Sequence, residues 1–146
     1  MSLKLYLSPD VTSLISANSP FAVTFNGRTG CAQDWRIYIR NDEASKYYTD
    51  IQVLAVDTSG GDSIVDGTKT NWYWKLKEKD ITPTLEEWNE ISPGNTLSLS
   101  STLGTSIGGD IVTFLPFWIR IAIPRVQPVQ TIQTVFLKIL ATEFLI

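Results

Sequence analysis

The sequence predicts an all-β fold, an antiparallel β-sandwich of immunoglobulin-like or jelly-roll type with one short helix. Three observations lead to this prediction. Apolar and polar residues alternate in short segments, turn-forming residues separate these segments, and only one segment has the spacing of a helix. The chain has 146 residues, of which 43% are hydrophobic, so one core and a single domain over residues 1–146 are expected.

Eight segments have the pattern of a β-strand. Side chains alternate between the two faces of a sheet, so a half-buried strand shows an apolar residue at every second position. The segments occupy residues 3–7, 21–25, 35–39, 51–57, 72–76, 96–99, 113–124 and 134–142. The turn signals between them are Ser19-Pro20, Asn26-Gly27, Asn41-Asp42, Gly60-Gly61, Asp66-Gly67, Pro93-Gly94 and Gly108-Gly109.

One helical turn or two interrupts the strands after Thr82. Thr84 and Glu87 have the spacing of a capping box, and Pro93-Gly94 would end the helix. Leu85, Trp88 and Ile91 form an apolar stripe, which we expect to seal one end of the sandwich. A ligand-stacking role for Trp88 is the alternative.

The last two strand segments are strongly apolar and predict a long β-hairpin with an unusual connection. Residues 126–134 repeat a branched apolar residue, a glutamine and a variable residue three times. A period of three fits an extended, polyproline-like arm over residues 124–134, whose apolar stripe would lie on a neighbouring protein. An ordinary loop that rejoins the sheet is the alternative. With the apolar C-terminus, the arm supplies the predicted partner-binding residues: Val126, Gln127, Val129, Gln130, Ile132, Gln133, Phe144, Leu145 and Ile146.

The composition favours a protein that is covered by another protein. Charged residues make up only 18%, while the chain has five Trp, five Tyr and six Phe, and interface cores are poor in charge and rich in aromatic residues. We therefore expect a homo-oligomer, with a trimer favoured. A net charge of −3 argues against nucleic acid as a partner. No apolar run approaches the ~18 residues of a membrane span and no signal peptide is evident, so assembly in a cytoplasm is expected.

The residues that carry most enzyme chemistry are scarce. The chain has no histidine, which excludes Ser-His-Asp and Cys-His arrangements. Cys31 is the single cysteine, so no disulfide can form within the chain, and we expect it to be a small buried residue. Glu86, Glu87 and Glu90 are explained by the predicted helix, and the polar loop 57–67 lacks the spacing of an EF-hand calcium loop. No enzyme activity, metal or cofactor is expected.

The aromatic residues allow a sugar-binding platform, but strand alternation favours core packing. The candidates are Trp72-Tyr73-Trp74 and Tyr47-Tyr48. In a strand, Trp72 and Trp74 share one face while Tyr73 points to the other, so they do not form one platform. We predict that Trp74 and Trp118 lie in the core between the two sheets.

Six motifs in one order resemble a recurring class of small virion proteins of tailed bacteriophages. They are Trp35–Asp42, Tyr47–Val53, Trp74–Leu76, Pro83–Trp88, Pro116–Arg120 and Ile123–Pro124. The resemblance covers most of the chain from about Phe21 onward. It implies a β-sandwich virion protein without enzymatic activity, one that decorates or cements a capsid or belongs to a tail or baseplate.

Together, these observations predict a non-enzymatic phage virion structural protein. The expected role is that of a capsid decoration or cement protein, which stabilises the head through contacts between subunits after assembly in the host cytoplasm. Its expected partner is the major capsid protein or another virion protein. A tail, neck or baseplate subunit and a carbohydrate-binding receptor module are the alternatives.

Overall fold

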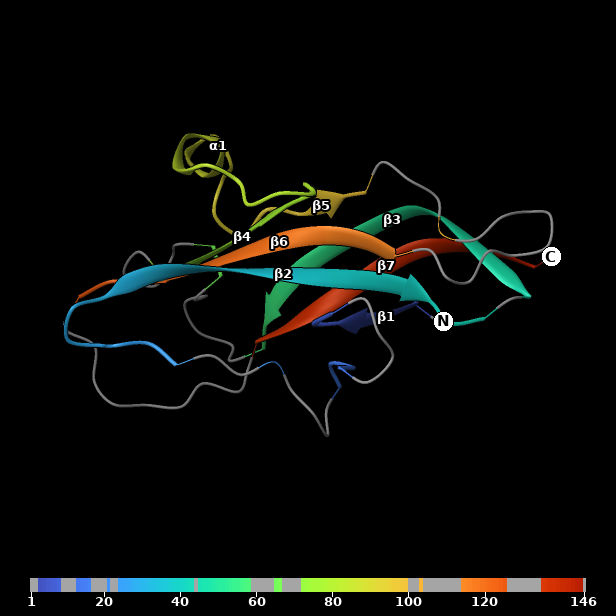
Figure 1. Cartoon of the computed structure of the whole chain (residues 1–146), viewed down its shortest axis with the longest axis horizontal. Helices are drawn as coiled ribbons and strands as arrows, with labels where there is room; N and C mark the ends of the chain where they lie inside the picture. Colours follow the sequence, from blue (N-terminus) through green and yellow to red (C-terminus); the bar gives the residue numbers. More distant parts are fainter. Residues whose placement is uncertain are drawn as a thin grey trace.

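The computed structural model describes residues 3–8, 13–16, 21, 24–43, 45–58, 65–66, 72–99, 103, 114–125 and 135–145. Within these residues the chain forms two antiparallel sheets and one short helix, which confirms the predicted all-β, sandwich-like fold (Figure 1). The strands are β1 (Leu3–Tyr6), β2 (Cys31–Asn41), β3 (Lys46–Asp57), β4 (Tyr73–Lys77), β5 (Leu97–Ser98), β6 (Phe114–Ile123) and β7 (Val135–Leu145). The helix α1 spans Leu85–Asn89.

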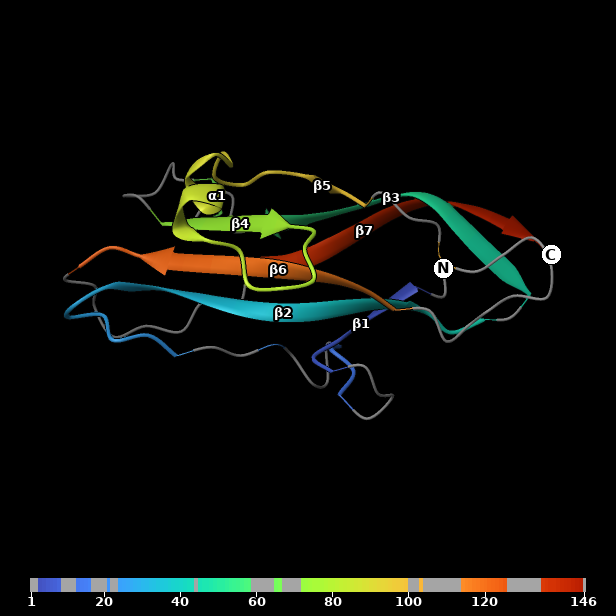
Figure 2. The same ribbon diagram turned by 45° about the horizontal axis from the view of Figure 1, so that its top comes forward.

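The strands form a four-stranded sheet of order β1-β2-β6-β4 and a three-stranded sheet of order β5-β3-β7. Figure 2 shows the second layer behind the first, with β3 and β7 running at an angle to β2 and β6. Side chains from both layers fill the core between them. Ile37, Phe117 and Ile119 from the first sheet and Tyr48 and Val53 from the second are completely buried there.

The last two strands do not form the expected hairpin. β6 lies between β2 and β4, whereas β7 pairs only with β3 in the other sheet. The physical reason lies in β6, whose residues Phe117, Ile119 and Ile121 face the core while, on the other face, Trp118 is half-buried and Ala122 is buried. Such a strand is stabilised in the middle of a sheet, and the connection to β7 is long enough to cross the ~10 Å between layers.

The segment around residues 21–25 is not a strand in its described part. Phe21 and Phe25 instead pack edge-to-face against Trp35, with ring centroids 5.5 Å and 6.0 Å apart and an interplanar angle of 84° in each pair. Aromatic rings in this geometry attract one another without any backbone ladder. Phe21 and Phe25 are therefore apolar because they pack against Trp35 at the border of the core.

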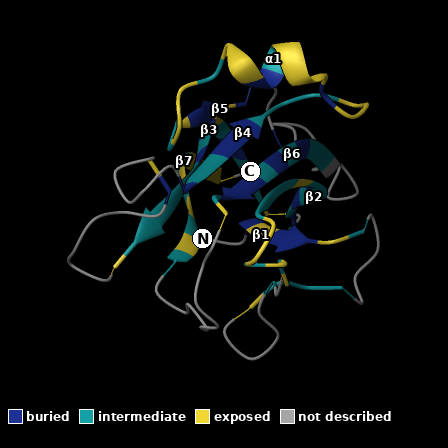
Figure 3. Cartoon of the chain, turned by 90° about the vertical axis from the view of Figure 1, so that its left-hand side faces the viewer, coloured by how far each residue is buried: buried dark blue, intermediate teal, exposed yellow. Residues whose placement is uncertain are grey.

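Helix α1 begins as predicted but packs elsewhere. The Thr84 hydroxyl accepts a hydrogen bond from the Glu87 backbone N–H, and the Glu87 carboxylate accepts one from the Thr84 N–H, which confirms the capping box. The helix lies on the outer face of the β1-β2-β6-β4 sheet and does not seal an end of the sandwich. Only Trp88 of the helix is buried, while Leu85 is 61% exposed. The ribbon of α1 is accordingly mostly yellow in Figure 3.

Two contacts fix Trp88 on that outer face. Its indole N–H donates a hydrogen bond to Asp34 at 3.3 Å, and the Lys75 ammonium donates one to the Trp88 carbonyl at 3.0 Å. A ligand-stacking role for Trp88 is thereby excluded, because the ring is 1% exposed.

The prediction for the two core tryptophans is half right. Trp74 packs against the core, as expected. Trp118 is on the opposite face of β6 from Phe117 and Ile119, so it points away from the space between the sheets. Its cross-strand neighbours are Arg36 on β2 and Lys77 on β4.

Candidate protein interface

The outward-facing side chains of β7 form an exposed apolar row. Leu137, Ile139 and Ala141 pack against the core, so the alternate residues of the strand point outward. Among these, Phe136, Leu140 and Phe144 are 48%, 42% and 40% exposed. Large apolar side chains this accessible, in line along one strand, are typical of a surface that another protein covers.

Strand β3 extends this row into a face. Val56 lies opposite Phe136, Leu54 opposite Lys138, and residues directly opposite in an antiparallel pair share one face. At the other end, the Tyr47 and Phe144 rings stack with centroids 4.8 Å apart and an interplanar angle of 11°. We call the set of Tyr47, Leu54, Val56, Phe136, Leu140 and Phe144 the outer apolar face.

A β-bulge keeps both halves of the outer apolar face on the same side. Thr49 pairs with Thr142 and Gln52 with Leu140, so β3 has one extra residue there. Asp50 at the bulge has φ of 51°, a left-handed conformation that Asp adopts more readily than most residues. Because of the bulge, Tyr48 and Ile51 both face the core, and Tyr47 is brought beside Phe144.

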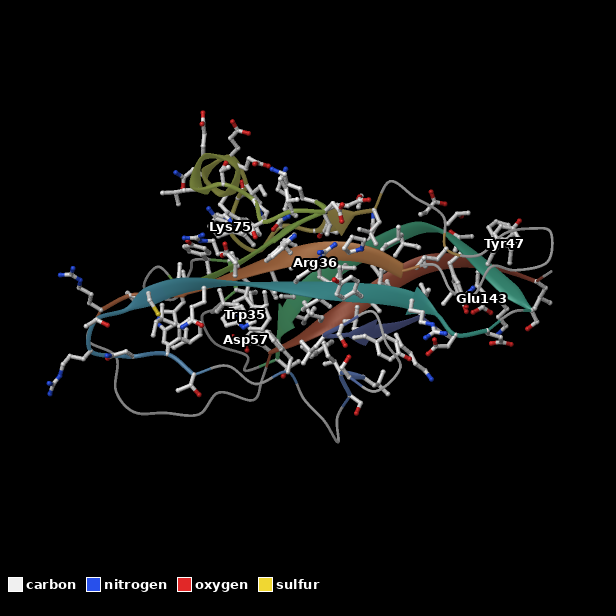
Figure 4. All side chains as sticks on the ribbon, in the orientation of Figure 1. Trp35, Arg36, Tyr47, Asp57, Lys75 and Glu143 are labelled. Carbon is white, nitrogen blue, oxygen red and sulfur yellow. The ribbon has the colours of Figure 1, made fainter. Side chains whose placement is uncertain are left out.

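A polar cluster fixes the C-terminal end of β7 to β3. The hydroxyl of the buried Tyr48 donates a hydrogen bond to Glu143 at 2.9 Å, and Lys46 lies 3.2 Å from the other carboxylate oxygen. Tyr48 and then Lys46 hold the pKa of Glu143 below its usual range, and the bond to Glu143 raises the pKa of Lys46. Figure 4 shows Tyr47 and Glu143 at this end of the sheet.

The structure places only part of the predicted partner-binding set. Phe144 belongs to the outer apolar face, and Leu145, next to it, is 76% exposed. The remaining predicted residues, Val126, Gln127, Val129, Gln130, Ile132, Gln133 and Ile146, lie outside the described residues, as does most of the expected arm. Val135, which continues the three-residue spacing of the predicted stripe after Ile132, packs against the protein's own core.

Sequence reasoning missed Phe136, Leu140 and Tyr47. The signal was present, because Phe136 and Leu140 alternate with Leu137 and Ile139 and so make β7 apolar on both faces. A strand of this kind belongs either in the middle of a sheet or beside a partner. Because β7 was expected to pair with β6 in a hairpin, the exposure of Phe136 and Leu140 was not predicted.

The outer face of the other sheet has a different chemistry. Six of its described cations lie beside carboxylates: Lys4 and Arg40 with Asp42, Arg36 with Asp80, Lys77 and Lys79 with Glu87, and Arg120 with Asp34. Lys75 differs, because its ammonium bonds to the Trp88 carbonyl. Burial, and then the nearby Arg120, lowers the pKa of Lys75. Figure 4 shows Arg36 and Lys75 on the side that carries α1. Charges paired in this way have the character of a solvated surface.

The residues weighed for catalysis, metal or sugar binding have structural surroundings. Glu87 caps α1 and pairs with two lysines, and Lys79 is the largest cause of its lowered pKa. Trp72 is buried with Val65 and Ile123, as strand alternation predicted, and the alternative of a sugar-binding Trp72-Tyr73-Trp74 platform is wrong. Among the described residues, no group of three or more Cys, Asp or Glu side chains could hold a metal ion. Most of the loop 57–67 lies outside them.

Cys31 is half-buried at the start of β2 and accepts a weak hydrogen bond from the Gln33 side chain at 3.7 Å. It is thus less covered than the sequence predicted. In the part of the chain that the structure describes, no helix has the length and hydropathy that a membrane span requires.

Comparison of the chain with family models, with curated proteins and with solved structures gave no match. The geometry of the outer apolar face and the resemblance in sequence motifs are therefore the basis for a functional proposal.

Proposed function

We propose that this chain is a non-enzymatic structural protein of a tailed-phage virion that binds a neighbouring virion protein through its outer apolar face. The observation that carries the proposal is the row of Phe136, Leu140 and Phe144, each at least 40% exposed on a strand whose opposite face is packed against the core. A row held on a sheet changes little on binding, so little conformational entropy is lost.

The chemistry of the face fits a protein partner. Aromatic and aliphatic side chains at the centre of an interface gain free energy by leaving water, at about 25 cal/mol per Å² of apolar surface. Lys138 and Thr142 lie between the three apolar residues on the same face of β7 and supply polar contacts that fix orientation.

The role proposed for the protein is that of a decoration or cement protein on the outside of the head, with the major capsid protein as partner. Such a protein stabilises a shell mechanically, because it adds contact area across adjacent subunits and is present in many symmetric copies. A position in the tail, neck or baseplate is the closest alternative, since the outer apolar face would serve equally there. A carbohydrate-binding role has less support, because Trp72 and Trp88 are buried.

A double variant, Phe136→Ser with Leu140→Ser, tests the proposal. It removes the centre of the outer apolar face, so its affinity for particles of the encoding phage stripped of this protein should fall at least about tenfold. Leu85→Ser with Ile81→Ser is the matched control, because these residues are 61% and 67% exposed on or near α1. The measurement is cosedimentation with particles, with circular dichroism to show that both variants are folded.

Two results would overturn the proposal: wild-type protein that does not bind heads, tails or intact virions, or a folded double variant that binds as tightly as wild type. Electron-microscopic reconstruction of the reconstituted particle then separates the head from the tail positions. Density on the outer shell, at many copies per particle, supports the cement role.

A further inference from the structure

The two sheets have four edge strands, and three of these are protected within the described residues. Residues 13–15 run along β1, where Leu7 N–H bonds to Ser13 at 3.1 Å and Ile15 N–H bonds to Leu5 at 2.9 Å. The edge of β4 is covered by Asn95 and Val65, and β5 is only two residues long. Short or covered edges prevent unwanted strand pairing.

The fourth edge, β7, shows none of these protections in the part of the chain that the structure describes. It has eleven residues and pairs with β3 on one side. Among the described residues, no backbone hydrogen bond reaches its other side. A long, open edge next to an exposed apolar row is the arrangement to which another strand adds.

The outward-facing residues of β7 have the same character in both directions along the strand. They are Phe136, Lys138, Leu140, Thr142 and Phe144, so an aromatic residue lies at each end, a polar residue comes next, and Leu140 is central. Two antiparallel copies related by a twofold axis at Leu140 place like with like: Phe136 faces Phe144, Lys138 faces Thr142, and Leu140 faces itself.

From this self-complementarity we infer that β7 pairs with β7 of a second copy of the chain, antiparallel and centred on Leu140. Each Phe136 then meets a Phe144 of the other copy, and aromatic pairs directly across two strands are stabilising. The pairing joins the two three-stranded sheets into one continuous sheet. It also joins the two outer apolar faces into one surface of twice the area.

Charge is consistent with this register. The Thr142 hydroxyl lies 3.5 Å from the carboxylate of the exposed Asp50. Lys138 of the second copy, placed opposite Thr142, is therefore within a lysine side chain's reach of that carboxylate. Registers shifted by two residues in either direction lose both Phe136–Phe144 pairs, and registers shifted by one would place core-facing residues opposite outward-facing ones.

The inference goes beyond the proposed function, because it requires only a second copy of this chain and no virion. It also differs from the trimer expected from the sequence, whose three-residue stripe lies mostly outside the described residues. A twofold axis closes on two copies, so the mass of the isolated protein separates the two possibilities.

Engineered cysteines test the register, with Cys31→Ser as the background. Residues facing themselves across the axis have Cα atoms about 4.5 to 5.5 Å apart, a distance a disulfide can span. Leu140→Cys should therefore give a covalent dimer under mild oxidation. Lys138→Cys alone should give no covalent dimer, because the two copies of residue 138 are about 14 Å apart. An equal mixture of Lys138→Cys and Thr142→Cys chains should cross-link, because these two positions face each other. Leu85→Cys, at a more exposed position on α1, is the control for random collision.

Sedimentation of the wild-type chain at micromolar concentrations should give the mass of a dimer. The inference is overturned if Leu140→Cys cross-links no more than Leu85→Cys, if Lys138→Cys alone cross-links as well as the mixture, or if the wild-type chain is a monomer or trimer. In those cases the β7 edge is left for a strand of a different protein. Binding to phage particles is measured separately, so each proposal can fail without the other.

Discussion

Glu143 is the residue at which pH should affect stability most directly. The buried Tyr48 hydroxyl and Lys46 both bind its charged form and lower its pKa. A carboxylate with a lowered folded-state pKa stabilises the fold fully above the unfolded-state pKa of about 4.3. That stabilisation is lost as the pH falls through the lower folded-state value.

Comparison of the wild-type protein with Glu143→Gln should show this effect. We expect the wild-type protein to have the higher free energy of unfolding at pH 7, and the difference to shrink as the pH falls below the unfolded-state pKa of about 4.3. Urea unfolding at several pH values measures it. In a Tyr48→Phe background, where the largest cause of the shift is removed, the difference should depend less on pH. A difference that is constant from pH 7 to pH 3 would contradict the assignment.

Phe117 and Trp118 are neighbours on β6 that should respond very differently to truncation. Phe117→Ala empties a fully buried site and should cost about 3 to 5 kcal/mol. Trp118→Ala should cost less than half as much, because the ring is half-buried on the outer face of the sheet. Trp118→Phe should be nearly neutral, since the indole N–H is buried and has no acceptor among the described groups. Thermal unfolding of the three variants checks the order.

At the scale of elements, Asn95 takes the place of a strand beside β4. Its side-chain amide accepts a hydrogen bond from the Leu76 N–H and donates one to the Leu76 carbonyl, both at 2.8 Å. Asn95→Ala should destabilise the protein by about 1 to 3 kcal/mol, because two backbone groups lose their partner. Asn95→Asp keeps the acceptor and removes the donor. We expect Asn95→Asp to have a free energy of unfolding no higher than that of Asn95→Ala, because its carboxylate would face the Leu76 carbonyl. Denaturant unfolding of both variants measures the two free energies.

The connection between β6 and β7 is predicted to serve assembly and not folding. Replacing Val126, Val129 and Ile132 together by Ser should leave the β-sheet circular dichroism nearly unchanged while weakening self-association or binding to phage heads. The reason is that a stripe with a period of three matches neither face of a strand. Loss of the folded spectrum in this variant would assign the stripe to the protein's own core.

At the scale of the whole molecule, the two outer faces of the sandwich predict different responses to salt. Among the described residues of β3 and β7 that point outward, beside the outer apolar face, Lys138 is the one cation. The face under α1 instead carries paired charges. Raising NaCl to about 1 M shortens the Debye length to about 3 Å and screens exposed charges. We expect affinity for phage particles to change less than about threefold over this range, as measured by cosedimentation. A tenfold loss would place the contact on the charged face instead.

Sequence periodicity was sufficient to predict those features that depend on residues close together in the chain. The capping box of Thr84 and Glu87, the strands around Ile37 and Val53, and the inward position of Trp74 could all be predicted, because each depends on spacing within one segment. The candidate interface was predicted only at its end, through Phe144. Its centre, Phe136 and Leu140, was not.

The sequence by itself determined the fold class, most of the strands and the helix cap, whereas the tertiary structure decided which strands pair and which faces are left exposed. β6 and β7 are each apolar on both sides, so alternation could not assign Trp118 or Phe136 to the core or to the surface. That choice follows from packing: β6 gains two neighbours between β2 and β4, and β7 pairs with β3 alone. Strand pairing depends on contacts between residues far apart in the chain, and a local pattern does not contain that information.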